Sequence, residues 1–181
     1  EVLRDEIDLA SDIEEKLLYY YRLADSVEEN LDDANRSMDV LKEAYLLNTD
    51  KMETLLRLRR LFDEKVGDPE AADLLEAYYA SHEDWEEVAA VLKRRFELSE
   101  GRDDRLENAQ KLVNVLLSRL EDKVRAIVYC GEALVIDPED FASLDQLLRL
   151  KDDTGMLSET VEYLQRARRA ADDVEAYRNL G

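Results

Sequence analysis

A repetition within the sequence is the feature that most restricts the fold. When the chain is shifted by 89 positions, Asp33 falls on Asp122 and the agreement continues along the chain. The further matched pairs are Arg36 with Arg125, Glu43-Ala44 with Glu132-Ala133, Leu55 with Leu144, Leu58 with Leu147, Arg60 with Arg149, Leu61 with Leu150 and Asp63 with Asp152. Such a run indicates internal repetition. A short repeated unit predicts an array in which each unit packs on its neighbours.

Apolar residues recur at helical spacing within each copy. Between Leu106 and Leu120 they follow one another at steps of three and four residues, and the spacing resumes after Asp122. This period predicts two amphipathic helices that form an antiparallel hairpin. Helices are expected near 5–30, 33–47, 51–65, 69–82, 84–99, 103–120, 122–136, 139–153, 157–171 and from 173 onward. The first range is long enough for the helix to break once.

Both prolines are interpreted as helix starts. In the stretch DPED, Asp137 is the expected N-cap and Pro138 takes the first helical position, where its missing N–H costs nothing. The segment Asp68-Pro69-Glu70 repeats the design. The acidic residues that follow each proline complement the positive end of the helix dipole.

Composition favours helices and limits the classes of partner. The 181 residues are 45% hydrophobic and include only five glycines and two prolines, which suits long helices better than an all-β fold. Forty-five acidic residues against 25 basic ones give a net charge of -20, which opposes binding to nucleic acid or anionic lipid. No apolar run approaches the roughly 18 residues of a membrane span. A soluble, cytoplasmic protein is therefore expected.

The copy at 107–140 resembles the tetratricopeptide repeat (TPR) family, whose unit is two helices in about 34 residues. Ala126 and Ala133 occupy small-residue sites of its second helix, and Pro138 is the closing proline. Further units resemble the family at 18–51, 69–99 and 141–173, with an extra helix at 51–65 and another helix or a cap at 173–181. The resemblance implies an all-α, right-handed superhelical solenoid of about nine to ten helices, in a single domain over 1–181.

The last residues extend this resemblance. Tyr177 to Gly181 is similar to the opening of a further repeat. We therefore expect the sequence to be a segment of a longer protein, of the kind found among uncharacterised bacterial repeat proteins.

Catalytic and metal-binding motifs find little support. Neither GRDDRLE nor DPEDF has the residue order of an EF-hand, and a di-iron bundle needs two histidines where the chain has only His82. Cys130 is the only cysteine, on the packing side of its helix, and there is no glycine-rich phosphate loop. We expect no enzyme activity, no metal and no cofactor.

Function is expected in a concave groove, which the resemblance implies is lined by the first helix of each unit. Carried over by position, Arg22 and Lys111 coincide at an early groove site and Arg60 and Arg149 at a later one, and Arg119 joins them. The expected function is a non-catalytic protein-interaction module that holds a peptide or protein segment, whose acidic side chains contact these cations. The alternative interpretation is that the cations complement helix C-termini and solubilise the surface.

Two other functions stay open. The array can be an architectural spacer or self-assembly element of a larger protein, which a concentration-dependent mass would favour. It also resembles, in broad terms, the acidic TPR-type secretion chaperones, for which a hydrophobic groove is expected. The oligomeric state and the partner are not indicated by the sequence.

Overall fold

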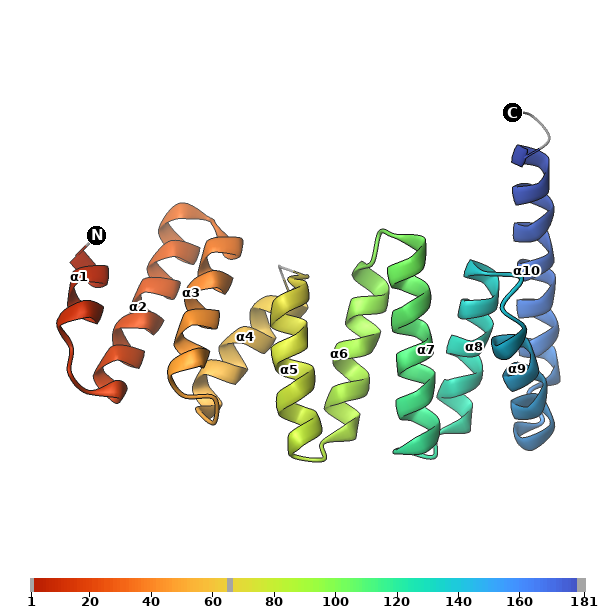
Figure 1. Cartoon of the computed structure of the whole chain (residues 1–181), viewed down its shortest axis with the longest axis horizontal. Helices are drawn as coiled ribbons and strands as arrows, with labels where there is room; N and C mark the ends of the chain where they lie inside the picture. Colours follow the sequence, from red (N-terminus) through yellow and green to blue (C-terminus); the bar gives the residue numbers. More distant parts are fainter. Residues whose placement is uncertain (1, 65–66, 179–181) are drawn as a thin grey trace. The chain divides into compact units, whose positions relative to one another are not determined.

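The computed structural model describes residues 2–64 and 67–178, with side chains up to residue 172 (Figure 1). Every regular element in these ranges is an α-helix, and there are ten of them. They are α1 (Val2–Leu9), α2 (Ile13–Leu31), α3 (Ala34–Leu47), α4 (Met52–Glu64), α5 (Pro69–Ser81), α6 (Trp85–Leu98), α7 (Arg102–Ser118), α8 (Lys123–Ile136), α9 (Phe141–Thr154) and α10 (Leu157–Arg178). The predicted all-α class is confirmed.

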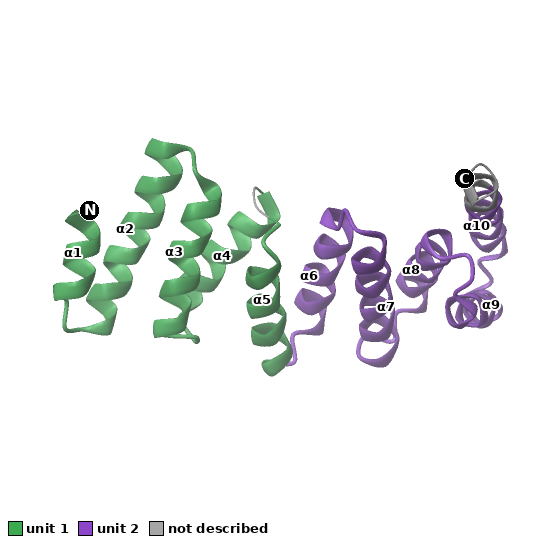
Figure 2. Ribbon diagram, turned by 45° about the horizontal axis from the view of Figure 1, so that its top comes forward, with its two compact units in different colours: residues 1–82 green, residues 83–181 purple. Residues whose placement is uncertain are grey.

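The helices fall into two compact units, 1–82 and 83–181 (Figure 2). In unit 1 each helix from α1 to α4 packs on the next one along the chain. In unit 2 α7 packs on α6 and α8, and α8 packs on both α9 and α10. The boundary falls in the turn between α5 and α6, so the single domain over 1–181 and its repeat units stay predictions.

One of the two helix spacings in unit 2 equals the period of tetratricopeptide-type units. Leu157 begins α10, 34 positions after Lys123 at the start of α8, whereas Phe141 begins α9, 39 positions after Arg102 at the start of α7. Ala126 of α8 is fully buried, as the resemblance requires of a small-residue site. The resemblance to this class of helical repeat thus extends from sequence to structure.

The predicted break within 5–30 is confirmed between α1 and α2. Ala10, Ser11 and Asp12 separate the two helices. The Asp12 side chain accepts a hydrogen bond from the backbone N–H of Glu15 at 3.2 Å, which satisfies one of the free donors at the start of α2.

The predicted start of α9 at Asp137 is wrong. Asp137 is the C-cap of α8, and its carbonyl accepts from Asp140 N–H at 3.0 Å, so Pro138 lies in a four-residue turn rather than in the helix. The N-cap is Asp140, whose side chain accepts from the backbone N–H of Ala142 and Ser143. The other proline behaves as predicted, because Asp68 caps α5 and accepts from Ala71 N–H at 2.7 Å.

The predicted helix break at 171–173 is also wrong, because α10 continues without interruption to Arg178. The segment Ala170-Ala171-Asp172 offers no glycine or proline, and alanine is the strongest helix former. Leu180 and Gly181, which completed the repeat-like ending, lie outside the described residues. A capping role for 173–181 stays a prediction.

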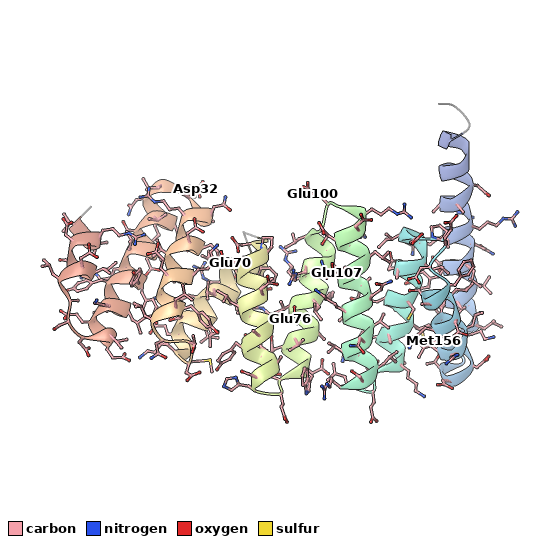
Figure 3. The ribbon with its side chains drawn as sticks, in the orientation of Figure 1. Asp32, Glu70, Glu76, Glu100, Glu107 and Met156 are labelled. Carbon is pink, nitrogen blue, oxygen red and sulfur yellow. The ribbon has the colours of Figure 1, made fainter. Side chains whose placement is uncertain are left out.

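Long-range contacts of polar side chains connect helices within each unit. In unit 1 Lys42 of α3 donates hydrogen bonds to Asp68 at 3.0 Å and to Glu70 at 2.8 Å. These bonds connect α3 with the start of α5, where Glu70 is labelled in Figure 3. In unit 2 Arg102 at the start of α7 donates to the carbonyl of Ile136 at 2.9 Å, and so holds the end of α8.

Gly131 allows α10 to approach α8 closely. A Cβ atom on Gly131 would lie 2.2 Å from Cγ of Tyr163, well inside the contact limit. The ring of Tyr163 therefore packs directly on the α8 backbone, in a space that only glycine leaves open. This contact explains a glycine in the middle of a helix, where it otherwise costs about 1 kcal/mol relative to alanine.

Three inter-helix turns place non-glycine residues in the left-handed region. Asp32, Glu83 and Glu121 have φ of 50°, 56° and 54°. After Glu121, the N–H of Asp122 donates to the carbonyl of Leu116 at 2.8 Å, which closes the C-terminus of α7 in a Schellman arrangement. Glycine is the preferred residue at such a position, because the left-handed conformation costs a residue with a Cβ roughly 1–2 kcal/mol.

Replacing Glu121 by glycine is therefore expected to raise the free energy of unfolding by about 1 kcal/mol. Urea unfolding monitored by circular dichroism measures the change, with an unchanged m-value. The matched control is Glu139→Gly, since Glu139 is exposed in a turn but does not have a positive φ. Glu139→Gly should lower the free energy of unfolding. A similar decrease for Glu121→Gly would contradict the explanation by its positive φ.

Candidate functional site

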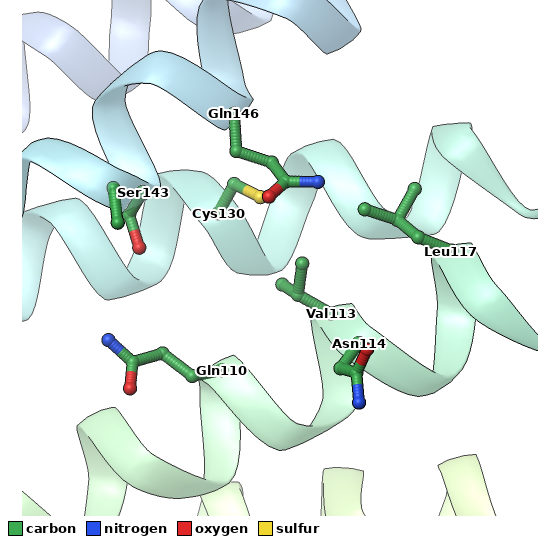
Figure 4. Close-up of a pocket in the computed structure, with 8 residues that line it drawn as sticks. Gln110, Val113, Asn114, Leu117, Cys130, Ser143 and Gln146 are labelled. Atoms are coloured by element: carbon green, nitrogen blue, oxygen red, sulfur yellow. The ribbon is translucent and has the colours of Figure 1, made fainter.

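Unit 2 contains a small groove formed by α7, α8 and α9. Its volume is about 260 Å³. The lining residues are Gln110, Val113, Asn114 and Leu117 from α7, Cys130 from α8, and Ala142, Ser143 and Gln146 from α9 (Figure 4). Ligand pockets for drug-sized molecules are usually about 300–1,000 Å³, so this groove suits one or two side chains of a peptide better than a cofactor.

Helix caps hold the α9 end of the groove in place. Asp140, the N-cap of α9, accepts from Ser143 Oγ at 2.6 Å and from Gln110 Nε2 at 2.8 Å. Burial alone would raise the pKa of Asp140, but these hydrogen bonds, led by those of Ser143, outweigh it and lower the pKa. An ionised Asp140 thus fixes the Gln110 side chain between α7 and the start of α9.

Two other carboxamides in the groove are available to a ligand. Among the described residues, no hydrogen bond involves the side-chain amide of Asn114 or Gln146. Figure 4 shows Gln146 extending from α9 near Cys130, while Gln110 and Asn114 come from α7. A carboxamide both donates and accepts hydrogen bonds, as the N–H and C=O groups of a polypeptide backbone require.

The floor of the groove is apolar and chemically inert. Cys130 is buried, and burial raises the pKa of its thiol to about 12. The thiol is therefore protonated at neutral pH and lacks the thiolate that nucleophilic cysteines use. Val113 and Leu117 complete an apolar floor beneath a polar rim, an arrangement suited to binding.

None of the three cations predicted in unit 2 is among the eight residues that line the groove. Lys111 follows Gln110 on α7 and forms an ion pair with Glu107 at 2.7 Å. Arg149 follows Gln146 by three positions on α9, has a side chain that is 78% exposed, and pairs with Asp145 at 2.7 Å. Figure 3 labels Glu107 on α7.

Arg119 contacts a different neighbour. Its guanidinium lies 4.5 Å from the ring centroid of Trp85, at the start of α6. A cation over an aromatic face is held there by the negative charge of the ring face. Helix α6 contributes no residue to the groove, so Arg119 is held on another side of α7.

The two cations predicted in unit 1 differ from one another. Arg22 is exposed on α2. Arg60 on α4 makes a two-pronged ion pair with Glu28 of α2, with contacts of 2.9 and 2.6 Å, and lies 3.8 Å from Glu64. This pair connects α4 with α2 within the unit. A peptide-binding role for these five cations stays a prediction.

The groove carboxamides Gln110, Asn114 and Gln146 were not among the residues predicted from the sequence. One signal was present: the chain has only three glutamines, and two of them, Gln110 and Gln146, line this groove.

A second hollow in unit 2 lies between α6 and α8, over α7. Its volume is about 490 Å³. Leu112, Leu116, Ala89, Ala90, Val128 and Tyr129 supply its apolar lining, and Glu86, Glu87, Lys93 and Arg125 its charged lining. Arg125 donates two hydrogen bonds to Glu86, each of 2.8 Å, from α8 to α6. We refer to it below as the apolar hollow.

Within the part of the chain that the structure describes, no three His, Cys, Asp or Glu side chains gather as a metal site would require. Over the same residues, no helix combines the length and apolarity needed to cross a bilayer.

Comparisons with known proteins give similarity to solved structures alone. No family model and no curated protein matches the chain. It is similar to the crystal structure of MamA, with 15% identity over 92% of each chain and a TM-score of 0.42. It is also similar to a putative kinesin light chain from Podosopora anserina with nearly identical TPR-like repeats, with 15% identity, 96% of this chain and 93% of that chain covered, and a TM-score of 0.41. The fold class therefore rests on the helices and their packing.

Proposed function

We propose that unit 2 is a non-catalytic protein-interaction module that binds an extended peptide segment in the groove between α7 and α9. The observation that carries this proposal is the pair of unengaged carboxamides, Asn114 and Gln146, which line the same groove from α7 and α9. They can hydrogen-bond to the ligand backbone, while Val113, Leu117 and Cys130 receive an apolar side chain.

An acidic ligand segment is the finer part of this proposal. Arg149 and Lys111 follow groove residues on α9 and α7, and their present partners Asp145 and Glu107 are exposed. Exposed ion pairs contribute little stability, so a ligand carboxylate can replace either partner at low cost. Arg22, Arg60 and Arg119 would contribute only where a longer segment reaches them.

A random-sequence peptide library, selected on the full chain, tests the binding. Peptides so recovered are expected to bind about tenfold more weakly to an Asn114→Ala, Gln146→Ala variant, because each lost hydrogen bond removes about 1 kcal/mol or less. Fluorescence anisotropy with the labelled synthetic peptides measures the dissociation constants.

The matched control removes two carboxamides elsewhere, at Asn35 and Gln165, both exposed. This control should bind as the wild type does. Recovery of no peptide, or equal affinity of the Asn114→Ala, Gln146→Ala variant and the wild type, argues against the groove. Charge reversal at Lys111 and Arg149 tests the acidic segment separately, and unchanged affinity would exclude it.

A chaperone function is the second candidate, and the apolar hollow favours it. Chaperoning of a secretion substrate calls for a hydrophobic surface, which the half-buried Ala90, Val128 and Tyr129 supply. Replacing Ala90, half-buried at this hollow, by glutamate should then abolish solubilisation of a co-expressed client and leave peptide binding in the groove unchanged. If the protein is instead an architectural spacer, no ligand should bind in the groove between α7 and α9 or in the apolar hollow.

A further inference from the structure

Asp140 is an ionised carboxylate whose hydrogen-bond donors are all uncharged. Its Oδ1 accepts from the backbone N–H of Ala142 at 3.1 Å and of Ser143 at 3.2 Å. Its Oδ2 accepts from Ser143 Oγ at 2.6 Å and from Gln110 Nε2 at 2.8 Å. Among the residues that the structure describes, no cation forms an ion pair with Asp140. This end of the groove therefore has a negative charge that only the dipole of α9 offsets.

The same hydrogen bonds leave two acceptor atoms available to a ligand. A carboxylate accepts and does not donate, so Gln110 must turn its NH₂ group toward Asp140, which leaves its carbonyl oxygen without a partner. Ser143 donates its only hydroxyl hydrogen to Asp140, so its oxygen can still accept. Gln110 and Ser143 bond the same oxygen and therefore meet at one end of the groove, away from Leu117 (Figure 4).

The charge of Asp140 acts within the groove. Burial is the main cause that raises the pKa of the Cys130 thiol to about 12, and the negative charge of Asp140 adds to the increase. Because Cys130 lies in the groove floor, the field of the carboxylate extends over the space that a ligand would occupy. The nearby cations Lys111 and Arg149 are each paired with an acidic residue on their own helix. A ligand cation is therefore favoured at this end of the groove.

A lysine side chain matches both parts of this arrangement. Its four-carbon stem can lie along the apolar floor at Val113 and Cys130, while its compact ammonium offers three donors to acceptors on two different helices. Arginine fits less well, because its planar fork is suited to gripping a carboxylate with two parallel hydrogen bonds. The four hydrogen bonds that Asp140 already accepts fill the roughly four lone-pair positions of a carboxylate.

We propose that this end of the groove is a subsite for a lysine side chain, whose ammonium donates to Gln110 Oε1 and Ser143 Oγ in the field of Asp140. We call it the ammonium subsite. The inference rests on the proposed peptide-binding function and names the residue that the groove selects. Acidic residues of the same ligand would lie outside the groove, at Lys111 and Arg149.

Peptides selected on the full chain from the random-sequence library test the subsite. They should share a lysine, and replacing that lysine by norleucine keeps most of the stem but removes the charge. The dissociation constant should then rise about tenfold or more in fluorescence anisotropy, because hydrogen bonds from an ammonium are charge-assisted. Acetylation of the peptide N-terminus should change nothing. Affinity that is lost on acetylation but kept with norleucine would overturn the assignment to lysine.

An Asp140→Asn variant tests the source of the preference. Asparagine is as good an N-cap as aspartate, so α9 keeps its start while the charge is removed. The lysine and norleucine peptides should then bind with equal affinity. The matched control is Asp33→Asn, at the N-cap of α3, where Asp33 accepts from the backbone N–H of Arg36 at 3.0 Å. This control should keep the preference for lysine, and a preference that survives in Asp140→Asn overturns the proposal.

Nuclear magnetic resonance separates the subsite from the peptide-binding function. Nα-acetyl-lysine amide at millimolar concentration should shift the side-chain amide resonances of Gln110 but not those of the exposed Gln165, and Nα-acetyl-norleucine amide should shift neither. If the library yields no peptide and the lysine probe still shifts Gln110, peptide binding fails and the subsite stands. Peptides that depend on Asn114 and Gln146 but not on a lysine overturn the subsite alone.

Discussion

Replacing Phe62 by alanine is expected to destabilise unit 1 by about 4 kcal/mol, the largest effect that we predict. Phe62 of α4 is among the largest fully buried side chains. Its removal loses the transfer free energy of the ring and leaves a cavity that the packed helices only partly fill. Phe62→Leu, which keeps most of the volume, should cost less than about 1.5 kcal/mol.

Hydrogen exchange read by mass spectrometry locates this loss. Protection should fall in α4 and in its neighbours α3 and α5. It should stay unchanged in α7, α8 and α9, because these helices belong to the other compact unit. An equal loss of protection in both units would contradict this prediction, because it would mean that the two units unfold together in one cooperative transition.

Replacing Gly131 by alanine is expected to destabilise unit 2 by about 2 kcal/mol. An alanine in place of a mid-helix glycine gains about 1 kcal/mol from backbone entropy. At this position the new Cβ would lie 2.2 Å from Cγ of Tyr163, so the ring or α10 itself must shift. Overpacking of a buried contact costs up to about 3 kcal/mol, which outweighs the gain.

A double-mutant cycle isolates the cause of this effect. In a Tyr163→Ala background the collision is absent, so Gly131→Ala should become neutral or stabilising by up to about 1 kcal/mol. Urea unfolding of the four proteins measures both steps. If Gly131→Ala costs the same with and without the tyrosine ring, then the contact between α8 and α10 does not explain the glycine.

Local chemistry made the helices predictable from the sequence. The spacing of apolar residues indicated nine of the ten helix positions, and Asp33, Asp68 and Asp122 cap helices within one or two residues of the predicted starts. Caps and periodicity act over a few residues, so no tertiary contact is needed to recognise them. At α9 the local pattern predicted Asp137 as the N-cap, whereas the structure has Asp140 in that position.

The candidate site was less predictable, because it depends on how each helix is rotated. The family resemblance implied a groove lined by the first helix of each unit and placed cations there, which stays a prediction. The carboxamides of Gln110, Asn114 and Gln146, which line the groove between α7 and α9, were not predicted. A slip of one residue turns a helical side chain by about 100°, so a position correct in sequence can face a different neighbour. Arg119 illustrates this, because it lies over Trp85 of α6.

The all-α class, the repetition and most helix ends are readable from the amino-acid sequence, since they follow from periodicity, capping and the placement of glycine and proline. The tertiary structure decided which side chains meet. Tyr163 packs on Gly131, Glu28 engages Arg60, and Asp140 holds Gln110. These contacts join residues about 30 positions apart, and the packing of neighbouring helices, rather than any local preference, sets their geometry.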